Sequence, residues 1–313
     1  MTANHDIVLE VRGVSHWFGP VKVLFDLNLR IARGQIVGLV GPSGCGKSTL
    51  LRAIVGTHPP NEGTVYMNGQ AVTYPGRDRG IVYQRYSLYP FLTARQNVTF
   101  GLKLDQTSIP FRMFRPLAWR KLRREYEHEA IKLLTKVGLG DAVDKYPDEL
   151  SGGMRQRVAF ASAMVMKPQI LLLDEPFGAL DEATREELQR MLLSLYQENM
   201  EAKRMGEQPP YTILMVTHEL NEALYVSDRI VGLSQYWDWA AAGHKQLPGA
   251  SIIYDAPAPV HEPDTPREFE QFQEQRDQIR NVVFEPKQLP DRETHVHFWD
   301  DVKAGHAAGV LKP

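Results

Sequence analysis

The sequence predicts an α/β protein with a mainly parallel core sheet, an N-terminal antiparallel β subdomain and an inserted helical subdomain. Between residues 170 and 234, short apolar strands alternate with helices, which is typical of a parallel sheet covered on both faces. The first 40 residues instead alternate apolar and polar side chains, as paired strands do. The block at 93–167 is mostly helical and interrupts the pattern, so we expect it to form the inserted subdomain.

The N-terminal part divides into several predicted strands. The stretches IVLEVRGV and VLFDLNLRIA are followed by an Arg-Gly turn at 33–34 and by a short apolar strand at 35–40. The stretch TVYMNGQAV predicts a hairpin, because the Asn-Gly pair at 68–69 favours the tight turns that join antiparallel strands. Residues 81–84 predict one more short buried strand.

The second half of the chain contains the predicted strands 170–175, 212–218 and 229–234, with helices between them. The polar stretch 198–211 lengthens the link before the second of these strands and predicts a surface loop. Pro and acidic residues become frequent after residue 235. We therefore expect a main domain at 1–234 and a C-terminal extension of unknown role at 235–313.

Two features of this extension suggest local structure. The stretch 267–284 predicts a helix with a narrow apolar stripe, made of Phe269, Phe272, Ile279 and Val283. His295 and His297 would project from one face of a strand and could bind a metal, although two ligands alone are a weak signal. The alternative is an extension that simply packs on the domain or stays partly disordered.

Composition excludes several classes of protein. The 313 residues carry a formal net charge of −2, which gives no electrostatic reason to expect nucleic acid. The single cysteine, Cys45, allows no internal disulfide and suits a reducing compartment. The N-terminus lacks the features of a signal peptide, and no apolar run is long enough to span a membrane. Any action at a membrane would therefore need a partner that spans it.

Residues 41–48, Gly-Pro-Ser-Gly-Cys-Gly-Lys-Ser, fit the phosphate-binding pattern GxxxxGK[ST] and lie between a strand and a helix, as that pattern requires. Glycines let consecutive backbone N–H groups surround phosphate oxygens at a helix N-terminus. We expect Lys47 to reach the β- and γ-phosphates and the Ser48 hydroxyl to ligate Mg²⁺. Cys45 is interpreted as a small filler residue. The predicted nucleotide-binding residues are Gly41, Pro42, Ser43, Gly44, Cys45, Gly46, Lys47, Ser48 and Thr49.

A second candidate site follows the apolar stretch LLL at 171–173. Asp174 and Glu175 end this strand at the carboxyl edge of the sheet, where ligands of α/β proteins bind. Successive strand side chains point in opposite directions, so Asp174 can face Mg²⁺ while Glu175 leaves the strand toward the attacking water. Glu175 is the candidate general base.

The stretch DELSGGMRQR at 148–157 contains no base, nucleophile or metal-ligand cluster. Ser151 can cap the following helix, while Gly152 and Gly153 leave backbone N–H groups open to an anion. The sequence thus predicts a second phosphate-reading helix start without a lysine. No role can be assigned to Met154.

With these motifs in this order, residues 8–233 closely resemble the ATP-binding subunit of ABC transporters. The matching positions are Phe18 (adenine stacking), residues 41–49 (Walker A), Gln84 (contact with Mg²⁺ and the attacking water), Ser151, Gly152 and Gly153 (signature), Asp174 and Glu175 (Walker B), Asp181 (D-loop) and His218 (the switch histidine).

The resemblance implies an ATPase in which two subunits, expected to be two copies, enclose two ATP molecules between them. Each ATP would contact the Walker motifs of one subunit and the signature of the other. It further implies Mg²⁺ as cofactor, with Ser48, Gln84 and Asp174 at the metal, and Glu175, His218 and Gln84 as the catalytic residues. The expected partners are membrane-spanning permease subunits and a substrate-binding protein, with no nucleic acid, at the cytoplasmic face of the membrane.

Within the family, LYPFLTARQNV and LLLDEPFGALDEATREELQ are most similar to the importers of nitrate, taurine and aliphatic sulfonates. The alternative is a soluble ABC-type ATPase that acts as a mechanical switch outside transport. The long coiled coils of DNA-repair members and the duplicated ATPase unit of translation members are both missing from this sequence. A P-loop kinase is a weaker alternative, because the Ser-Gly-Gly motif and His218 would have no role in it.

One segment does not fit the family pattern. Residues 106–126 are longer than usual, contain no acid between Gln106 and Arg124, and interleave aromatic with basic residues. Such a segment suits a membrane interface or an acidic partner surface. One alternative is a solvated helix whose aromatic side chains pack on the helical subdomain; another is nucleic-acid binding, which the slightly acidic chain disfavours. The residues concerned are Phe111, Arg112, Phe114, Arg115, Trp119, Arg120, Lys121, Arg123 and Arg124.

Overall fold

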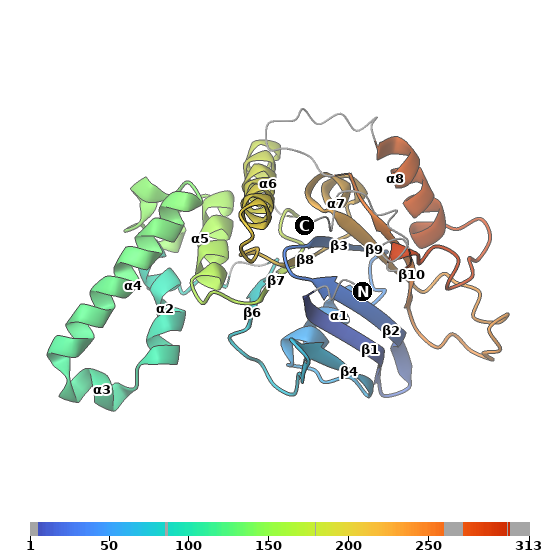
Figure 1. Ribbon diagram of the computed structural model, residues 1–313, viewed down its shortest axis with the longest axis horizontal. Coiled ribbons are helices and arrows are strands. Elements are labelled where there is room, and N and C mark those ends of the chain that lie inside the picture. Colours follow the sequence, from blue (N-terminus) through green and yellow to red (C-terminus); the bar gives the residue numbers. More distant parts are fainter. Residues whose placement is uncertain (1–5, 85–86, 179, 260–271, 299, 301–313) are drawn as a thin grey trace.

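The computed structural model describes residues 6–84, 87–178, 180–259, 272–298 and 300. A four-stranded and a six-stranded sheet form its centre, and a group of helices stands out to one side of them (Figure 1). This arrangement confirms the predicted α/β class with an N-terminal antiparallel sheet and a helical insertion. Among the described residues, none of the helices has both the length and the apolar composition needed to cross a membrane.

The smaller sheet is antiparallel, with strand order β2-β1-β4-β5. Its strands are β1 (Ile7–Phe18), β2 (Val21–Ala32), β4 (Glu62–Met67) and β5 (Gln70–Ala71). The predicted hairpin at 64–72 is confirmed. Both residues of its turn, at 68–69, have positive φ angles of 46° and 77°, the conformation that an Asn-Gly pair adopts with little strain.

The larger sheet has the strand order β10-β9-β3-β8-β7-β6 and is parallel except for β10. Its strands are β3 (Ile36–Val40), β6 (Arg79–Val82), β7 (Ile170–Asp174), β8 (Ile213–Thr217), β9 (Arg229–Ser234) and β10 (Ser251–Pro257). The strand predicted at 81–84 is present but ends two residues earlier than expected, because β6 stops at Val82.

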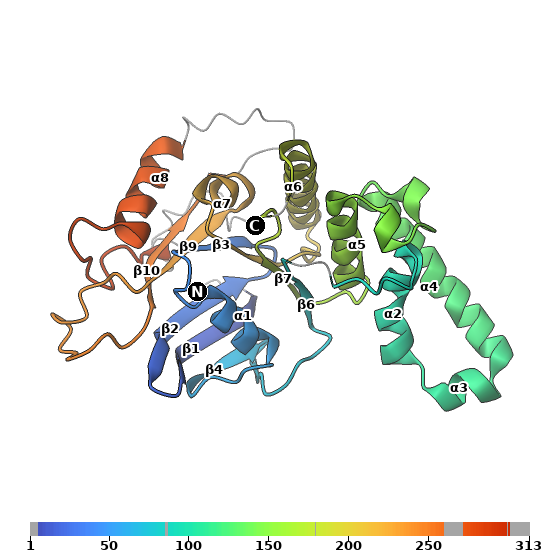
Figure 2. The same cartoon turned by 180° about the vertical axis from the view of Figure 1, so that it is seen from behind.

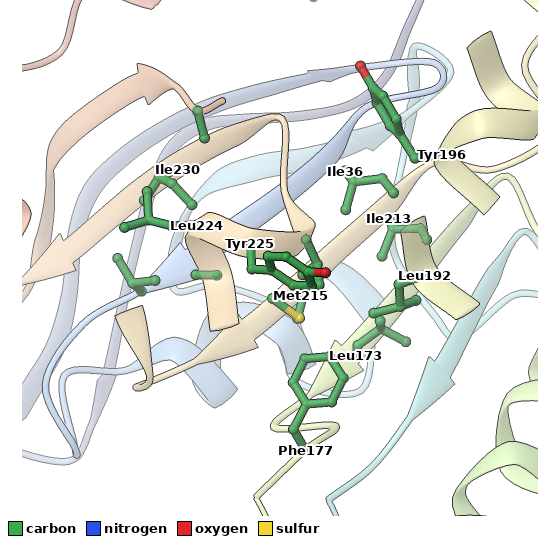
Figure 3. Packing of buried hydrophobic residues seen from close by; sticks show 14 of the residues in the cluster. Ile36, Leu173, Phe177, Leu192, Tyr196, Ile213, Met215, Leu224, Tyr225 and Ile230 are labelled. Carbon is green, nitrogen blue, oxygen red and sulfur yellow. The ribbon is translucent and has the colours of Figure 1, made fainter. Parts of the chain in front are cut away.

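Alternate side chains of these strands enter two different cores, as the two-residue period of a strand requires. Leu171 and Leu173 pack with α6 (Glu182–Arg204) and α7 (Leu220–Val226) on one face, in the cluster that Figure 3 shows. Ile170 and Leu172 pack with α1 (Lys47–Val55) and the antiparallel sheet on the other. Burial on both faces explains why these strands are continuous apolar runs.

The helical subdomain is built from four α-helices and two short 3₁₀ turns around a core of its own. Thr93 begins it with a capping box, in which its hydroxyl accepts from Gln96 N and its own N–H donates to Gln96 Oε1. Its elements are α2 (Ala94–Gln106), α3 (Ile109–Phe114), α4 (Pro116–Lys136), η1 (Gly140–Ala142), η2 (Pro147–Glu149) and α5 (Gly152–Met164).

The surface loop expected at 198–211 is partly wrong, because α6 continues to Arg204. The structure explains the polar sequence differently. Asn199 is fully buried, its Nδ2 donates to the carbonyl oxygens of Gly34 (3.2 Å) and Tyr211 (2.6 Å), and its Oδ1 accepts from Tyr211 N. The polar residue therefore anchors the end of α6 instead of facing solvent.

The segment after residue 234 is packed on the core. It supplies β10, then α8 (Gln273–Ile279) and the π-helical turn η4 (Arg280–Phe284). The predicted helix at 267–284 is confirmed for its described part, whose stripe residues Phe272, Ile279 and Val283 are buried in the core that α6 and α7 share. Phe269 lies outside the described residues. The domain boundary at residue 234 stays a prediction.

The strand expected around His295 and His297 is wrong. Val296 forms only an isolated bridge with Asp255, and the surrounding residues form turns. The Nε2 atom of His297 lies 2.5 Å from the carbonyl oxygen of Thr294. This ring nitrogen therefore contacts the backbone and not the side chain of another potential metal ligand. The described part of the chain contains no group of three or more His, Cys, Asp or Glu side chains suited to a metal ion.

Candidate active site

Four neighbouring strands of the core sheet end at the same edge, and each delivers one of the singled-out residues. The strands β3, β8, β7 and β6 are adjacent and parallel, so their carboxyl ends lie side by side. β3 leads into Gly41, and β8 is followed directly by His218. β7 ends at Asp174 just before Glu175, and Gln84 follows β6. The topology thus brings together residues from four distant parts of the chain.

The loop between β3 and α1 has the backbone that a phosphate cradle needs. Gly46 has a φ of 104°, and a Cβ atom there would lie 2.6 Å from Leu24 Cδ2, so only glycine fits. Lys47 is buried, and its Nζ donates to the carbonyl oxygen of Gly41 at 2.7 Å, which keeps the ammonium group folded over the loop. Burial raises the pKa of the Cys45 thiol, which fits its role as a filler.

The carboxylate at the end of β7 is linked to the first turn of α1. The Ser48 side chain lies close enough to Asp174 to lower its pKa, as expected for two ligands of one cation. Burial, and then the neighbouring Glu175, raise the pKa of Asp174, while Arg52, Ser48 and Lys47 act in the opposite direction. Carboxylate and hydroxyl oxygens are the ligands that Mg²⁺ prefers, so the donor set fits this ion.

Glu175 lies just beyond the strand, as the sequence predicted, and its φ of 50° turns the chain away. Its N–H still donates to Val216 O at 2.9 Å. This turn brings its Oε2 to 2.6 Å from Nδ1 of His218. A Cβ atom on Gly178 would lie 3.4 Å from Gln84 Nε2 and 3.7 Å from Glu175 Oε2. Glu175, His218 and Gln84 therefore border the same small space.

Phe18 ends β1 and is 46% exposed, which leaves its ring available for stacking. Its edge packs against His16 with ring centroids 4.6 Å apart, and burial lowers the pKa of that histidine. Phe18 pairs with Val21 on β2, and Val23 on the same strand borders Gly46. The hairpin therefore places this aromatic at the end of the sheet that adjoins the phosphate-binding loop.

The signature residues lie in a different part of the molecule. Ser151 is the N-cap of α5 and accepts from Met154 N at 3.2 Å. A Cβ atom on Gly153 would lie 1.8 Å from Thr184 Cγ2, so this glycine is required by close packing against α6. Figures 1 and 2 show α5 within the helical subdomain, apart from α1. One chain therefore does not bring its own signature to its own phosphate-binding loop.

Two neighbours of the signature also acquire a structural role. The side chain of Met154 packs against the core of the helical subdomain, which the sequence did not reveal. Asp181 caps α6 by accepting from Thr184 N (3.0 Å) and Thr184 Oγ1 (2.8 Å), and these hydrogen bonds lower its pKa. Thr184 thus connects Asp181 to Gly153. Ala179 of the same motif lies outside the described residues.

Sequence reasoning missed Glu222, which lies behind the site. Glu222 lies in a cavity of about 250 Å³ that Glu175 and His218 also line, and burial raises its pKa to about 7. Its carboxylate accepts from Thr217 Oγ1 at 3.3 Å and lies 3.4 Å from Nε of Arg185. The available signal was its position four residues after His218, one turn along a predicted helix.

Comparison with known proteins agrees with this geometry. The family described as "ABC transporter" matches residues 24–178. The nitrate import ATP-binding protein NrtD of Synechococcus elongatus is 42% identical over 213 residues, which are 68% of this chain and 70% of that protein. The chain belongs to the ABC transporter family. It is the ATP-binding subunit, an ATPase that hydrolyses ATP to drive transport.

Two further relatives extend the comparison of this ABC ATPase. The bicarbonate transport ATP-binding protein CmpC of Synechocystis is 46% identical over 216 residues, but the chain spans only 29% of that protein's length. A solved dimeric ATP-binding cassette bound to ADP and Pi is 27% identical, with a TM-score of 0.59 over 80% of this chain and 99% of the cassette. Family members of this kind dimerise and work with permease components.

Proposed function

We propose that this ABC ATPase binds Mg²⁺ and ATP on residues 41–49 and hydrolyses ATP with Glu175 as general base, in a pair of subunits. The observation that carries the proposal is the 2.6 Å contact between Glu175 and His218. The contact lies at the edge of the sheet where Asp174 and the loop that carries Lys47 also end. A base needs both an orienting neighbour and a bound phosphate within reach, and this edge offers both.

The binding roles follow from the chemistry of each group. Backbone N–H groups of the loop surround the phosphates, and Lys47 exchanges its carbonyl contacts for phosphate oxygens. Phe18 stacks on the adenine ring. Ser48, Asp174 and Gln84 hold Mg²⁺, which when bound neutralises charge on the phosphate oxygens.

Hydrolysis joins the oxygen of a water molecule to the γ-phosphorus and breaks the bond from that phosphorus to the ADP oxygen. Glu175 orients this water and takes up its proton. Gln84, which borders the same space, also contacts the water. His218 holds Glu175 in place and contacts the γ-phosphate. Most of the rate enhancement comes from positioning and charge stabilisation, as in other phosphoryl transfers.

The pair is most simply two copies of this chain. Ser151, Gly152 and Gly153 of one copy contact the ATP held by the other, and Asp181 lies at the same interface. The separation of α5 from α1 within one chain supports this arrangement, because the anion-reading helix start would otherwise have no ligand (Figure 1). The similar cassette that was solved as a dimer supports it too.

In the membrane, the pair powers an importer of a small solute, of the class that includes nitrate, sulfonates and taurine. Relatives named for nitrate and bicarbonate transport support this direction and cargo class. The partners are membrane-spanning permease subunits and a substrate-binding protein, and the ATPase lies at the cytoplasmic face as a peripheral subunit. The competing proposal is an ABC-type switch outside transport, for which recovery without any membrane-spanning partner would be the deciding observation.

The experiment that tests the catalytic role is Glu175→Gln. The variant keeps the size and polarity of the side chain but removes the base, so we expect ATP binding to persist and hydrolysis to fall by about 100-fold or more. Measurement of ATP affinity, phosphate release and the oligomeric state with ATP separates these effects. A trapped ATP-bound dimer is the expected state of the variant.

The matched control is Glu219→Gln, because Glu219 is a second carboxylate within 4 Å of His218, with its Oε1 3.6 Å from the histidine Nε2. It should hydrolyse ATP nearly as fast as the unmodified chain. Normal turnover by Glu175→Gln, or equal losses in both variants, would show that the base has been misassigned.

A further inference from the structure

The helical subdomain carries a surface that the proposed ATPase cycle does not use. We call it the tip and define it by six residues at the corner between α3 and α4. Figures 1 and 2 show this corner at the outer end of the subdomain, away from the six-stranded sheet. The tip residues are Phe114, Arg115, Leu117, Arg120, Lys121 and Arg124.

Large apolar side chains are exposed at the tip. Phe114 is 75% exposed and Leu117 is 83% exposed. The backbone explains why they cannot fold inward. Helix α3 has only six residues and ends at Phe114, and α4 starts at Pro116 after the single linking residue Arg115, so the chain turns a corner between the two apolar residues. Exposed apolar residues of this size, gathered at a protruding corner, indicate a binding surface.

The basic residues of the tip lie on one face of α4. Leu117, Arg120, Lys121 and Arg124 are spaced by three, one and three residues, which places them on a single helical stripe. The four basic residues of the tip, Arg115 included, are exposed and form no ion pair with any described residue. The neighbouring Arg123 differs, because it is paired with Glu127 at 2.9 Å. No acidic residue occurs between positions 106 and 124 to balance this charge.

The opposite face of α4 has a different role. Trp119 and Tyr126 point into the subdomain, where they pack against its core and against each other with ring centroids 6.3 Å apart. They also line a cleft of about 820 Å³ inside the corner, to which none of the six tip residues contributes. The aromatic residues of this segment thus divide into an inward-facing set that packs and an outward-facing tip.

We propose that the tip binds the surface of an anionic lipid bilayer. Phe114 and Leu117 enter the interfacial layer, while the guanidinium and ammonium groups beside them contact lipid phosphates. An ordinary solvated helix face carries charges of both signs and few large apolar residues. The tip instead carries only positive charges and two large exposed apolar residues. Unpaired basic side chains that flank exposed apolar ones are the pattern of interfacial membrane binding. The contact needs no protein partner, so its failure would leave the proposed ATPase function untouched.

The test uses the full chain and extruded vesicles without any other protein. Binding is measured by co-sedimentation with vesicles of phosphatidylcholine alone and with vesicles that contain phosphatidylglycerol. Each basic residue near an anionic surface strengthens binding about fivefold, so Arg120→Glu with Lys121→Glu should weaken it by at least about 25-fold. Leu117→Asp should also weaken binding, and 0.5 M salt should abolish most of it.

The matched control is Arg204→Glu with Lys287→Glu, which changes the net charge equally at two exposed residues that are outside the tip. It should bind vesicles like the unmodified chain. ATP hydrolysis and circular dichroism should be unchanged in all of these variants, since their side chains are solvent-exposed.

Three results would overturn the proposal. The first is equal binding to anionic and neutral vesicles. The second is an equal loss of vesicle binding in the tip and control variants. The third is vesicle binding that persists in both tip variants. If the tip variants instead lose only a membrane protein that co-purifies with the chain, the tip recognises an acidic protein and the lipid assignment is wrong.

Discussion

Two helix starts in this chain contain glycine for different reasons. At α1, Gly46 is required by its own backbone, with a φ of 104°. At α5, Gly153 has ordinary backbone geometry and is required because Thr184 leaves no room for a Cβ atom. The first start has Lys47 and Asp174 beside it, and the second has only the Ser151 cap. In the proposed function, the α1 start is therefore a complete anion site, while the α5 start reads a phosphate presented by another molecule.

The largest expected effect is on the complete site. Lys47→Ala removes the only lysine of the loop, and loss of a charge-assisted contact costs about 2–3 kcal/mol. We therefore expect ATP affinity to fall by about 30- to 160-fold, measured by equilibrium binding to the purified chain. Lys132→Ala, an exposed lysine on α4, is the control. Unchanged affinity in Lys47→Ala would show that the loop does not hold the phosphates.

The two reasons for glycine can be distinguished by testing whether a second substitution restores the stability lost in each glycine variant. Gly153→Ala should destabilise the fold by about 1–3 kcal/mol through overpacking against Thr184, measured by denaturant unfolding. Thr184→Ser removes the clashing methyl group and keeps the hydroxyl that bonds Asp181, so the double variant should regain much of the loss. Gly46→Ala should not be rescued by Leu24→Ala, because backbone strain remains. Equal rescue at both positions would contradict the comparison.

Substitution of the residue that caps α5 should affect ATP hydrolysis without affecting ATP binding. Ser151→Ala should cost about 1 kcal/mol of stability through the lost cap and lower ATP hydrolysis by about tenfold. ATP binding by the single chain should stay unchanged, because its own loop is intact. Ser108→Ala is the matched control, since Ser108 caps α3 in the same way by accepting from Phe111 N. A similar loss of hydrolysis in both variants would mean that only stability was affected.

The smallest effect concerns Glu222, behind the complete site. Burial raises its pKa from 4.5 to about 7 in the folded chain. The unfolded chain therefore releases this proton at lower pH, and stability should fall as pH rises from about 4.5 to about 7. Glu222→Gln removes this contribution, so the variant should gain stability relative to the unmodified chain as pH rises.

Thermal unfolding at pH 5 and pH 8 measures the difference between the two proteins. Asp228 shifts in the same direction, and comparison at each pH cancels its contribution. A stability difference that does not change between pH 5 and pH 8 would show that Glu222 ionises normally in the folded chain.

Much of the fold was predictable because its signals are local. The Asn-Gly turn at 68–69 and the apolar strands each follow from a few neighbouring residues. Stretch 198–211 was misjudged for the opposite reason. Asn199 is polar, but its Nδ2 donates to Gly34, 165 residues away, and to Tyr211 at the other end of the same stretch, so sequence alone could not show that it is buried. His295 and His297 fail as a strand because β10 pairs with β9 and only bridges their segment.

The candidate chemistry of this ATPase could be predicted from the amino-acid order alone. The residues of the loop at 41–49, the pair at 174–175 and the Ser-Gly-Gly motif indicate which groups can meet phosphate, since backbone conformation and donor type are local properties. Which of these groups come together depends on the fold as a whole. Parallel strands from distant parts of the chain bring Glu175 to His218, while the helical subdomain holds Ser151 apart. The same packing turns Trp119 inward and leaves Leu117 exposed, because α4 has a single core to cover.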